Sequence, residues 1–176
     1  MKNLFFEHIG SQPADLVLEI GRMWALDPNP SKINLGIGIY LNEEGKCPVM
    51  AAVKKAEEKL LKTEETKSYL PIDGDSQFLK EAKNLLFNED SSYVVAMQTL
   101  GGTGALRILA DYLKLEIEKP IYVSDPTWPN HHGVFKAAGL DVRTYPYYDR
   151  STHTPKKQEF IDFLDTIEKG SIVVLH

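Results

Sequence analysis

Residues 93–175 alternate between short apolar segments and amphipathic segments, and this alternation constrains the fold more than any other feature of the sequence. The apolar segments cover residues 93–98, 120–124, 140–145 and 171–175, and the helical patterns cover 103–115, 129–138 and 155–168. Strands that alternate with helical patterns of this length are typical of βαβ units, in which the strands run parallel. The sequence therefore predicts an α/β fold, with helices flanking a mainly parallel sheet.

Residues 1–92 follow a different rhythm. The spacing of apolar residues predicts helices over 14–25, 48–62 and 76–87, and a short apolar segment with two glycines covers 33–40. The sequence contains no internal repeat and no low-complexity linker. The change of rhythm near residue 93 indicates that the first part has another role, such as a small lobe, an arm or an interface.

Composition excludes several classes of protein. The 176 residues are 43% hydrophobic and carry a net charge of -5, which is unlike a disordered chain or a basic nucleic-acid binder. No apolar run approaches the roughly 20 residues of a membrane-spanning helix. Cys47 is the single cysteine, so an intrachain disulfide and a Cys-rich zinc site are both excluded. This cysteine usage fits a protein of the reducing cytosol.

A glycine-rich segment, residues 100–107, joins the first apolar segment to the helical pattern after it. Its glycines let an oxyanion approach the backbone, and Thr103 adds a hydroxyl at a helix N-terminus, where the dipole favours negative charge. The alternative is a tight turn that needs glycine for its geometry. A dinucleotide-binding fingerprint needs a third glycine at the position that Arg107 occupies. A P-loop needs a lysine close to its last glycine, but the first lysine after Gly104 is Lys114. A single phosphate monoester is the phosphate ligand that remains.

A second candidate segment, residues 124–132, follows the next predicted strand and so lies at the same edge of a parallel sheet. Trp128 stands between two prolines, where it either offers a flat face to a ring or packs a loop. His131 and His132 point about 100° apart on a helix, so they are not a paired metal site. For each histidine the alternative is a capping or surface residue.

Two further segments give weaker signals. In residues 34–40, alternate glycines that include Gly38 either bring N–H groups near a small anion or allow a close crossing of chains. In residues 67–74, Tyr69 either donates its hydroxyl to a ligand or packs beside the turn that follows it.

Taken in this order, the segments resemble the aspartate and aromatic amino acid aminotransferases, class I members of the fold-type I enzymes that use pyridoxal 5′-phosphate (PLP). The resemblance runs from Pro13 to His176, and the segments that carry it are 34–40, 53–57, 69–74, 101–106, 124–131 and 147–149. It implies that Gly102 and Thr103 hold the PLP phosphate. It also implies that Trp128 stacks on the pyridine ring and helps to hold the substrate carboxylate. His131 would hydrogen-bond to the aspartate that pairs with the pyridine nitrogen.

The resemblance also implies an architecture. Residues 1–45 would form an N-terminal arm and a segment of the small domain, and residues 46–176 the incomplete first part of the large PLP-binding domain. Gly38 would contact the substrate carboxylate through its backbone, and Tyr69 would reach across a homodimer interface to the partner's cofactor phosphate. The implied activity is a ping-pong exchange of an amino group between an amino acid (aspartate, glutamate or an aromatic one) and a 2-oxo acid. The implied location is the cytoplasm, with no nucleic-acid or membrane partner.

The Schiff-base lysine of this family has no counterpart in the sequence. None of the 16 lysines stands in the family's serine-flanked context, and those at 54–62 and 80–83 lie on predicted amphipathic helices. We therefore expect the catalytic lysine to lie beyond His176, the chain to be an N-terminal fragment, and the chain alone to be inactive. The alternative is a non-catalytic fragment that binds a phosphate ligand or serves dimerisation.

Overall fold

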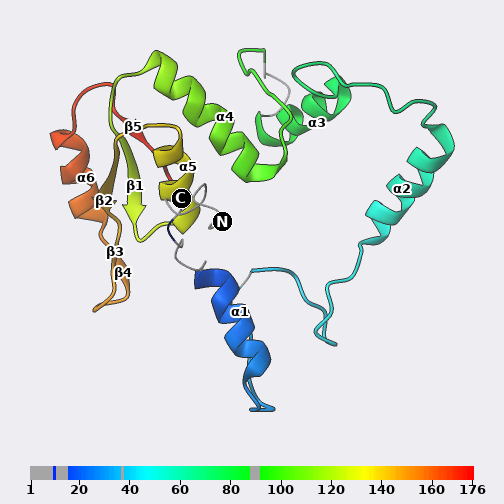
Figure 1. The fold of residues 1–176 in the computed structure, drawn as a ribbon, viewed down its shortest axis with the longest axis horizontal. Helices are drawn as coiled ribbons and strands as arrows, with labels where there is room; N and C mark the ends of the chain where they lie inside the picture. The colour runs from blue at the N-terminus through cyan, green and yellow to red at the C-terminus, as the bar shows by residue number, and fades with distance from the viewer. Residues whose placement is uncertain (1–9, 11–15, 37, 88–91) are drawn as a thin grey trace, which may run out of the picture. The chain divides into compact units, whose positions relative to one another are not determined.

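The computed structural model describes residues 10, 16–36, 38–87 and 92–176 (Figure 1). The chain divides into two units, residues 1–67 and residues 68–176. The expected arm at the N-terminus and residues 13–15, where the resemblance and the first predicted helix begin, lie outside the described residues. The expected domain boundary between residues 45 and 46 stays a prediction, because this division describes contacts within the 176 residues and does not test it.

The described part of the first unit contains the helices α1 (Leu16–Leu26) and α2 (Ala51–Thr63), where the apolar spacing predicted them. Lys32 closes the end of α1, since its Nζ donates to the carbonyl oxygens of Trp24 and Asp27 at 2.7 Å each. These carbonyls belong to the group that a helix end leaves without an intrahelical partner. No residue of α2 is buried.

The second unit is built on a parallel sheet with the strand order β2–β1–β5. The central strand β1 (Ile121–Asp125) pairs with β2 (Val142–Pro146) on one side and with β5 (Ile172–Val173) on the other. The register places Ile121 opposite both Val142 and Ile172. The predicted parallel α/β arrangement is confirmed.

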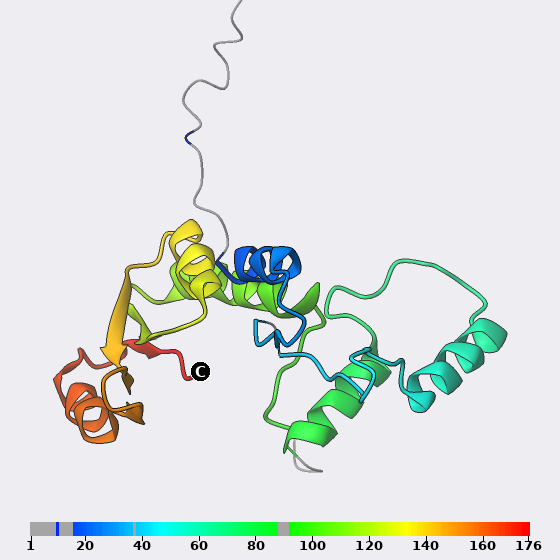
Figure 2. The same ribbon diagram turned by 90° about the horizontal axis from the view of Figure 1, so that it is seen from below.

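Helices cover both faces of this sheet. The helices of the second unit are, in chain order, α3 (Ser76–Phe87), α4 (Gly101–Glu116), α5 (Pro129–Ala137) and α6 (Lys157–Thr166), all within or close to the predicted ranges. The last three of them are the helices that cover the sheet. Figure 2 shows α4 and α5 on one side of the strands and α6 on the other. In the described ranges, no helix is both long and apolar enough to cross a membrane.

The core lies between the sheet and the α4–α5 layer. Its buried side chains are Ala110, Ile121, Val123, Phe135 and Leu140. Because successive side chains of a strand point to opposite faces, Tyr122 and Ser124 face α6 instead. There the Tyr122 ring meets the Phe163 ring edge-on, with the centroids 5.1 Å apart.

The predicted strand at residues 93–98 is wrong, because the structure assigns no strand there. A strand needs a neighbour to share its ladder of hydrogen bonds, and this segment is held by a turn instead. The Gln98 N–H donates to the Asp73 carbonyl at 2.8 Å, and the Gln98 Oε1 accepts the Asp75 N–H at 2.9 Å. Gly74 allows this close approach, since its φ is +105° and a Cβ there would collide with the Gln98 side chain.

A short antiparallel hairpin was not predicted. Its strands β3 (Tyr148–Asp149) and β4 (Thr154–Pro155) lie between β2 and α6 in the chain. The Asp149 Oδ1 closes the turn by accepting the N–H and the hydroxyl of Ser151, at 2.8 and 2.6 Å. Strands of two residues are too short to show alternation, so patterning cannot find them.

Candidate cofactor site

The first turn of α4 presents hydrogen-bond donors that the described residues do not use. Leu100, the residue before the helix, provides no side-chain cap. The Gly101 N–H donates to the Thr99 carbonyl at 2.9 Å, whereas the N–H groups of Gly102 and Thr103 have no partner among the described residues. Both of these residues are exposed. The helix therefore offers two free amides, the Thr103 hydroxyl and the positive end of its dipole to an anion.

The two glycines at positions 101 and 102 differ in what their surroundings require. Gly101 has a φ of +67°, which favours glycine in any turn. Gly102 has no such φ, and a Cβ at this position would meet no heavy atom within 4 Å. Neither backbone geometry nor packing within the described residues calls for glycine there, although glycine in a helix costs about 1 kcal/mol relative to alanine. The turn interpretation thus accounts for Gly101, whereas nothing in the described residues accounts for Gly102.

Trp128 stands directly before α5, at the carboxyl end of β1. Its backbone is extended, with φ −62° and ψ 124°, and Pro129 opens the helix, where the fixed φ of proline is favourable. The peptide bond between Asp125 and Pro126 in the same loop is cis. The indole is partly exposed and meets the His131 ring edge-on, with the centroids 5.4 Å apart. Trp128 is thus held by a neighbour while part of its ring stays accessible.

His131 is buried, with 6% of its surface exposed, so its interpretation as a surface or capping residue is wrong. The ring stacks on Phe135 at 6.0 Å and meets the ring of His176 edge-on at 5.2 Å. The Thr127 Oγ1 lies 2.7 Å from the His131 Nδ1, a hydrogen bond that fixes one ring nitrogen. Trp128 completes this enclosure. The imidazole therefore has one defined orientation.

The surroundings of His131 favour its neutral form. Burial lowers the pKa of His131 below 6.5, and the neighbouring His176 and His132 lower it further. A neutral imidazole offers one donor and one acceptor nitrogen at neutral pH. Below pH 6.5 the unfolded chain binds a proton that the buried ring resists, so this group makes the folded state less stable as the pH falls toward the lowered pKa.

The structure brings some of the predicted site residues together. Trp128 and His131 are in direct ring contact. Gly102 and Thr103 lie on α4, which packs against α5 in the same core. In the part of the chain that is described, no hydrogen bond or ring contact joins these two pairs. The site thus consists of two neighbouring elements, one that offers anion donors and one that offers an aromatic face.

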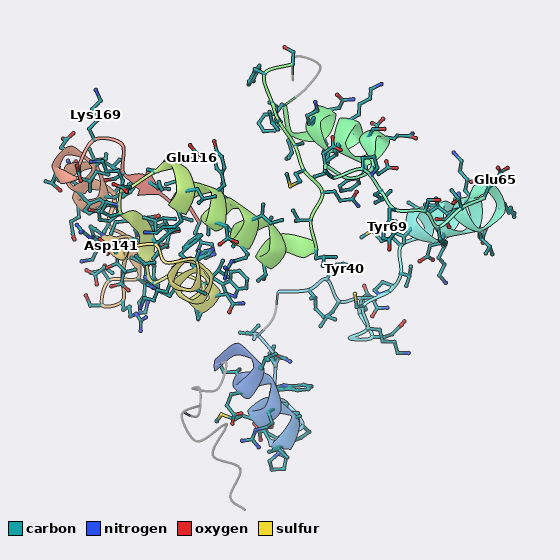
Figure 3. The ribbon with its side chains drawn as sticks, turned by 45° about the horizontal axis from the view of Figure 1, so that its top comes forward. Tyr40, Glu65, Tyr69, Glu116, Asp141 and Lys169 are labelled. Carbon is teal, nitrogen blue, oxygen red and sulfur yellow. The ribbon has the colours of Figure 1, made fainter. Side chains whose placement is uncertain are left out.

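The other two predicted residues belong to neither α4 nor the β1–α5 loop: Tyr69 is in the second unit and Gly38 in the first. The Tyr69 side chain is fully exposed on the segment between α2 and α3 (Figure 3). A groove of about 360 Å³ is lined by the segment that follows it, residues 70–74, by residues 98–100, and by Ile108 of α4. Gly38 is exposed in the first unit, and a Cβ there would meet nothing within 4 Å.

Two contacts of His131 were not predicted. Thr127 stands four residues before His131, a spacing that brings side chains together at the start of a helix, so a sequence signal existed. His176 reaches His131 only through the fold, by way of β5, and no local pattern indicates that contact. No group of three or more His, Cys, Asp or Glu side chains that could hold a metal ion occurs in the described ranges.

Comparisons with known proteins identify the family of this chain. The family model described as "Aminotransferase class I and II" matches residues 30–176. The aspartate aminotransferase of Escherichia coli K12 is 46% identical over 97% of this chain and 45% of its own length. An aromatic amino acid aminotransferase from Psychrobacter sp. B6, cocrystallised with aspartic acid, superposes with a TM-score of 0.90 at 38% identity, over 97% of this chain and 44% of that one. One from Burkholderia pseudomallei, covalently bound to pyridoxal phosphate, superposes with a TM-score of 0.88 at 39% identity and the same coverage. The chain spans about 45% of the length of the curated relatives it matches.

Proposed function

Because the chain belongs to the class I and II aminotransferases, we propose that it provides the phosphate-binding and ring-stacking part of a PLP site. The whole protein would transfer an amino group between an amino acid and a 2-oxo acid. The observation that carries this proposal is the open first turn of α4, with two unused amides and a glycine at 102 that the fold does not require. The aromatic face of Trp128 on the neighbouring element supports it.

The residues present fit the cofactor. A phosphate monoester carries close to two negative charges at neutral pH and three acceptor oxygens. The amides of Gly102 and Thr103, the Thr103 hydroxyl and the helix dipole supply matching donors and positive potential. Trp128 is partly exposed and so can stack on a planar ring. The candidate site thus has hydrogen-bond donors for the phosphate and an aromatic face for the pyridine ring.

PLP, when bound, supplies an electron sink for the bonds at the Cα of the amino acid. The chain's own residues would hold and orient the cofactor and the substrate. Gly102 and Thr103 would hold the phosphate, and Trp128 would limit the tilt of the ring and help to hold the substrate carboxylate. His131, neutral and oriented by the Thr127 hydroxyl, would keep a proton on one defined ring nitrogen and so fix the direction of its hydrogen bond.

The remaining roles concern the substrate and the assembly. Gly38 would contact the substrate carboxylate through its backbone, and Tyr69 would reach the cofactor phosphate of a partner copy in a homodimer. The full exposure of the Tyr69 side chain leaves it available for such a contact. The substrates would be aspartate, glutamate or aromatic amino acids with a 2-oxo acid, consistent with the names of the relatives. A cytoplasmic location fits the single cysteine.

The chain alone would bind the cofactor without transferring amino groups. The lysines whose side chains pair in the second unit do so with surface acids: Lys119 contacts Glu168, and Lys156 contacts Glu159. Within the described residues, no lysine makes a hydrogen bond or a cation–π contact with Trp128 or His131. We therefore propose none of these lysines as the Schiff-base lysine.

The two tryptophans of the chain provide a test of cofactor binding. Pyridoxine 5′-phosphate keeps the ring and the phosphate but lacks the aldehyde, so it does not react with surface lysines. We expect it to quench the fluorescence of the Trp24→Phe variant, whose remaining indole is Trp128, and to leave the Trp128→Phe variant unquenched. Inorganic phosphate should compete, because it occupies the same donors.

The matched probe is pyridoxine, which lacks the phosphate and should quench neither variant at the same concentration. Equal quenching of the two variants would contradict the proposed site. If the phosphate and pyridoxine 5′-phosphate bind equally tightly and Trp128→Phe changes neither, the chain is a general anion-binding module and the proposed cofactor role fails.

A further inference from the structure

Tyr145 connects the two outer strands of the sheet across the central one. It lies on β2 opposite Ser124 of β1, and its hydroxyl donates to the carbonyl oxygen of Val174 at 2.9 Å. Val174 follows β5 directly and donates its own N–H to the Tyr122 carbonyl at 2.9 Å. Since strands are about 4.8 Å apart, the outer two are separated by roughly 10 Å. The Tyr145 side chain therefore lies over β1 to reach its acceptor.

The packing around Tyr145 fixes this path. The side chain is 2% exposed, and its ring packs against Phe160 and Phe163 of α6, with centroids 4.9 and 6.0 Å away. Ser124, on the same face of β1, is 1% exposed, and its Oγ makes no hydrogen bond of normal geometry within the described residues. It lies close enough to the Tyr145 hydroxyl to oppose the rise in the pKa of Tyr145 that burial causes. The small size of the Ser124 side chain matters here, because a longer side chain would occupy the path of the Tyr145 ring.

Val174, whose carbonyl accepts the Tyr145 hydrogen bond, is two residues before His176. The His176 ring contacts His131. The carboxyl end of β5 is thus held at two points, by Tyr145 at the Val174 carbonyl and by β1 at the Val174 amide. Those two bonds set the course of the chain toward His131. The charged and titratable groups that face His131 there are His176 from the β5 side and His132 from its own helix.

We propose that Tyr145 is a positioning residue, whose hydrogen bond to Val174 across β1 places His176 against His131 at the candidate cofactor site. Its contribution to cofactor binding rests on the function proposed above, whereas the placement itself does not. Tyr145 acts on the site only through the chain at Val174, since its own ring faces α6 on the opposite side of the sheet from the α4–α5 layer.

The test compares Tyr145→Phe with Tyr147→Phe by NMR on the 176-residue chain. Tyr147 is on the neighbouring part of the chain, and its hydroxyl makes no hydrogen bond among the described residues, so it is the matched control. Tyr145→Phe removes one buried hydrogen bond, and we expect the Val174 amide to exchange with solvent about fivefold faster. The same variant should raise the pKa of His131 toward its ordinary value, because His176 would no longer be held over it. Tyr147→Phe should change neither property.

Two further results decide the proposal. Ser124→Leu, which blocks the path of the ring, should reproduce both changes, whereas Ser124→Ala should reproduce neither. Equal acceleration at Val174 and at the central Val123 amide would indicate general destabilisation and overturn the proposal. So would a His131 titration unaffected by Tyr145→Phe, or a His131 without a lowered pKa in the unmodified chain. Neither readout involves the cofactor, so failure of pyridoxine 5′-phosphate to bind would count against the proposed function alone.

Discussion

The Gly102→Asp variant is expected to bind pyridoxine 5′-phosphate about 100-fold more weakly than the unmodified chain. The new carboxylate would stand in the open space beside the unused amides of Gly102 and Thr103. Repulsion between a carboxylate and one phosphate charge about 5 Å apart is on the order of 3 kcal/mol at an effective dielectric constant near 20. Calorimetric titration of the two proteins would measure the change in affinity.

The same substitution should leave the fold intact or make it slightly more stable, which separates a ligand effect from a folding effect. An acidic residue in the first turn of a helix interacts favourably with the helix dipole, by about 0.3–1 kcal/mol. Ala52→Asp is the matched control, because residue 52 holds the same second position in α2 and is exposed, and that helix also lacks a side-chain cap. Ala52→Asp should keep full affinity. Unchanged affinity in Gly102→Asp would remove α4 from the phosphate site.

The Phe135→Ala variant is expected to lose about 3–5 kcal/mol of unfolding free energy, the range for removing a buried phenyl ring. Phe135 is 1% exposed, lies in the core cluster with Ile121 and Val123, and stacks on His131. Typical domains have only about 5–15 kcal/mol in total. The variant should therefore be close to unfolding at room temperature and should also lose the enclosure of His131.

Urea unfolding followed by circular dichroism would measure this loss. Phe78→Ala is the matched control in the same unit, because the Phe78 side chain is 54% exposed on α3. A substitution at such a position should change the unfolding free energy by about 0.5 kcal/mol or less. Similar losses in the two variants would mean that the α4–α5 face of the sheet is not the core.

The helices could be predicted from the sequence because each shows a continuous apolar stripe. The pattern at residues 76–87 gave the bounds of α3, and the glycine segment correctly marked the start of α4. The segment at 93–98 has the composition of a strand but lacks a paired neighbour, and pairing is a property of the whole sheet. The hairpin of β3 and β4 depends on one side chain, Asp149, and leaves no periodic signal.

The candidate site was predictable to different degrees. Gly102, Thr103 and Trp128 stand in local patterns with a chemical meaning, so their segments could be selected before the fold was known. The burial of His131 could not be inferred, because it depends on Phe135 one turn later and on His176 at the far end of the chain. The Tyr145–Val174 bond was equally hidden, since it joins strands that are neighbours only through β1.

The central claim is that the start of α4 and Trp128 together hold a phosphorylated pyridine. The most direct test is to titrate the ¹⁵N-labelled chain with pyridoxine 5′-phosphate and to map the shifted resonances. The account predicts that the largest shifts occur at the amides of Gly102 and Thr103 and at the Trp128 indole N–H. Shifts confined to the lysine-bearing surface of α2, with those three signals unmoved, would contradict it.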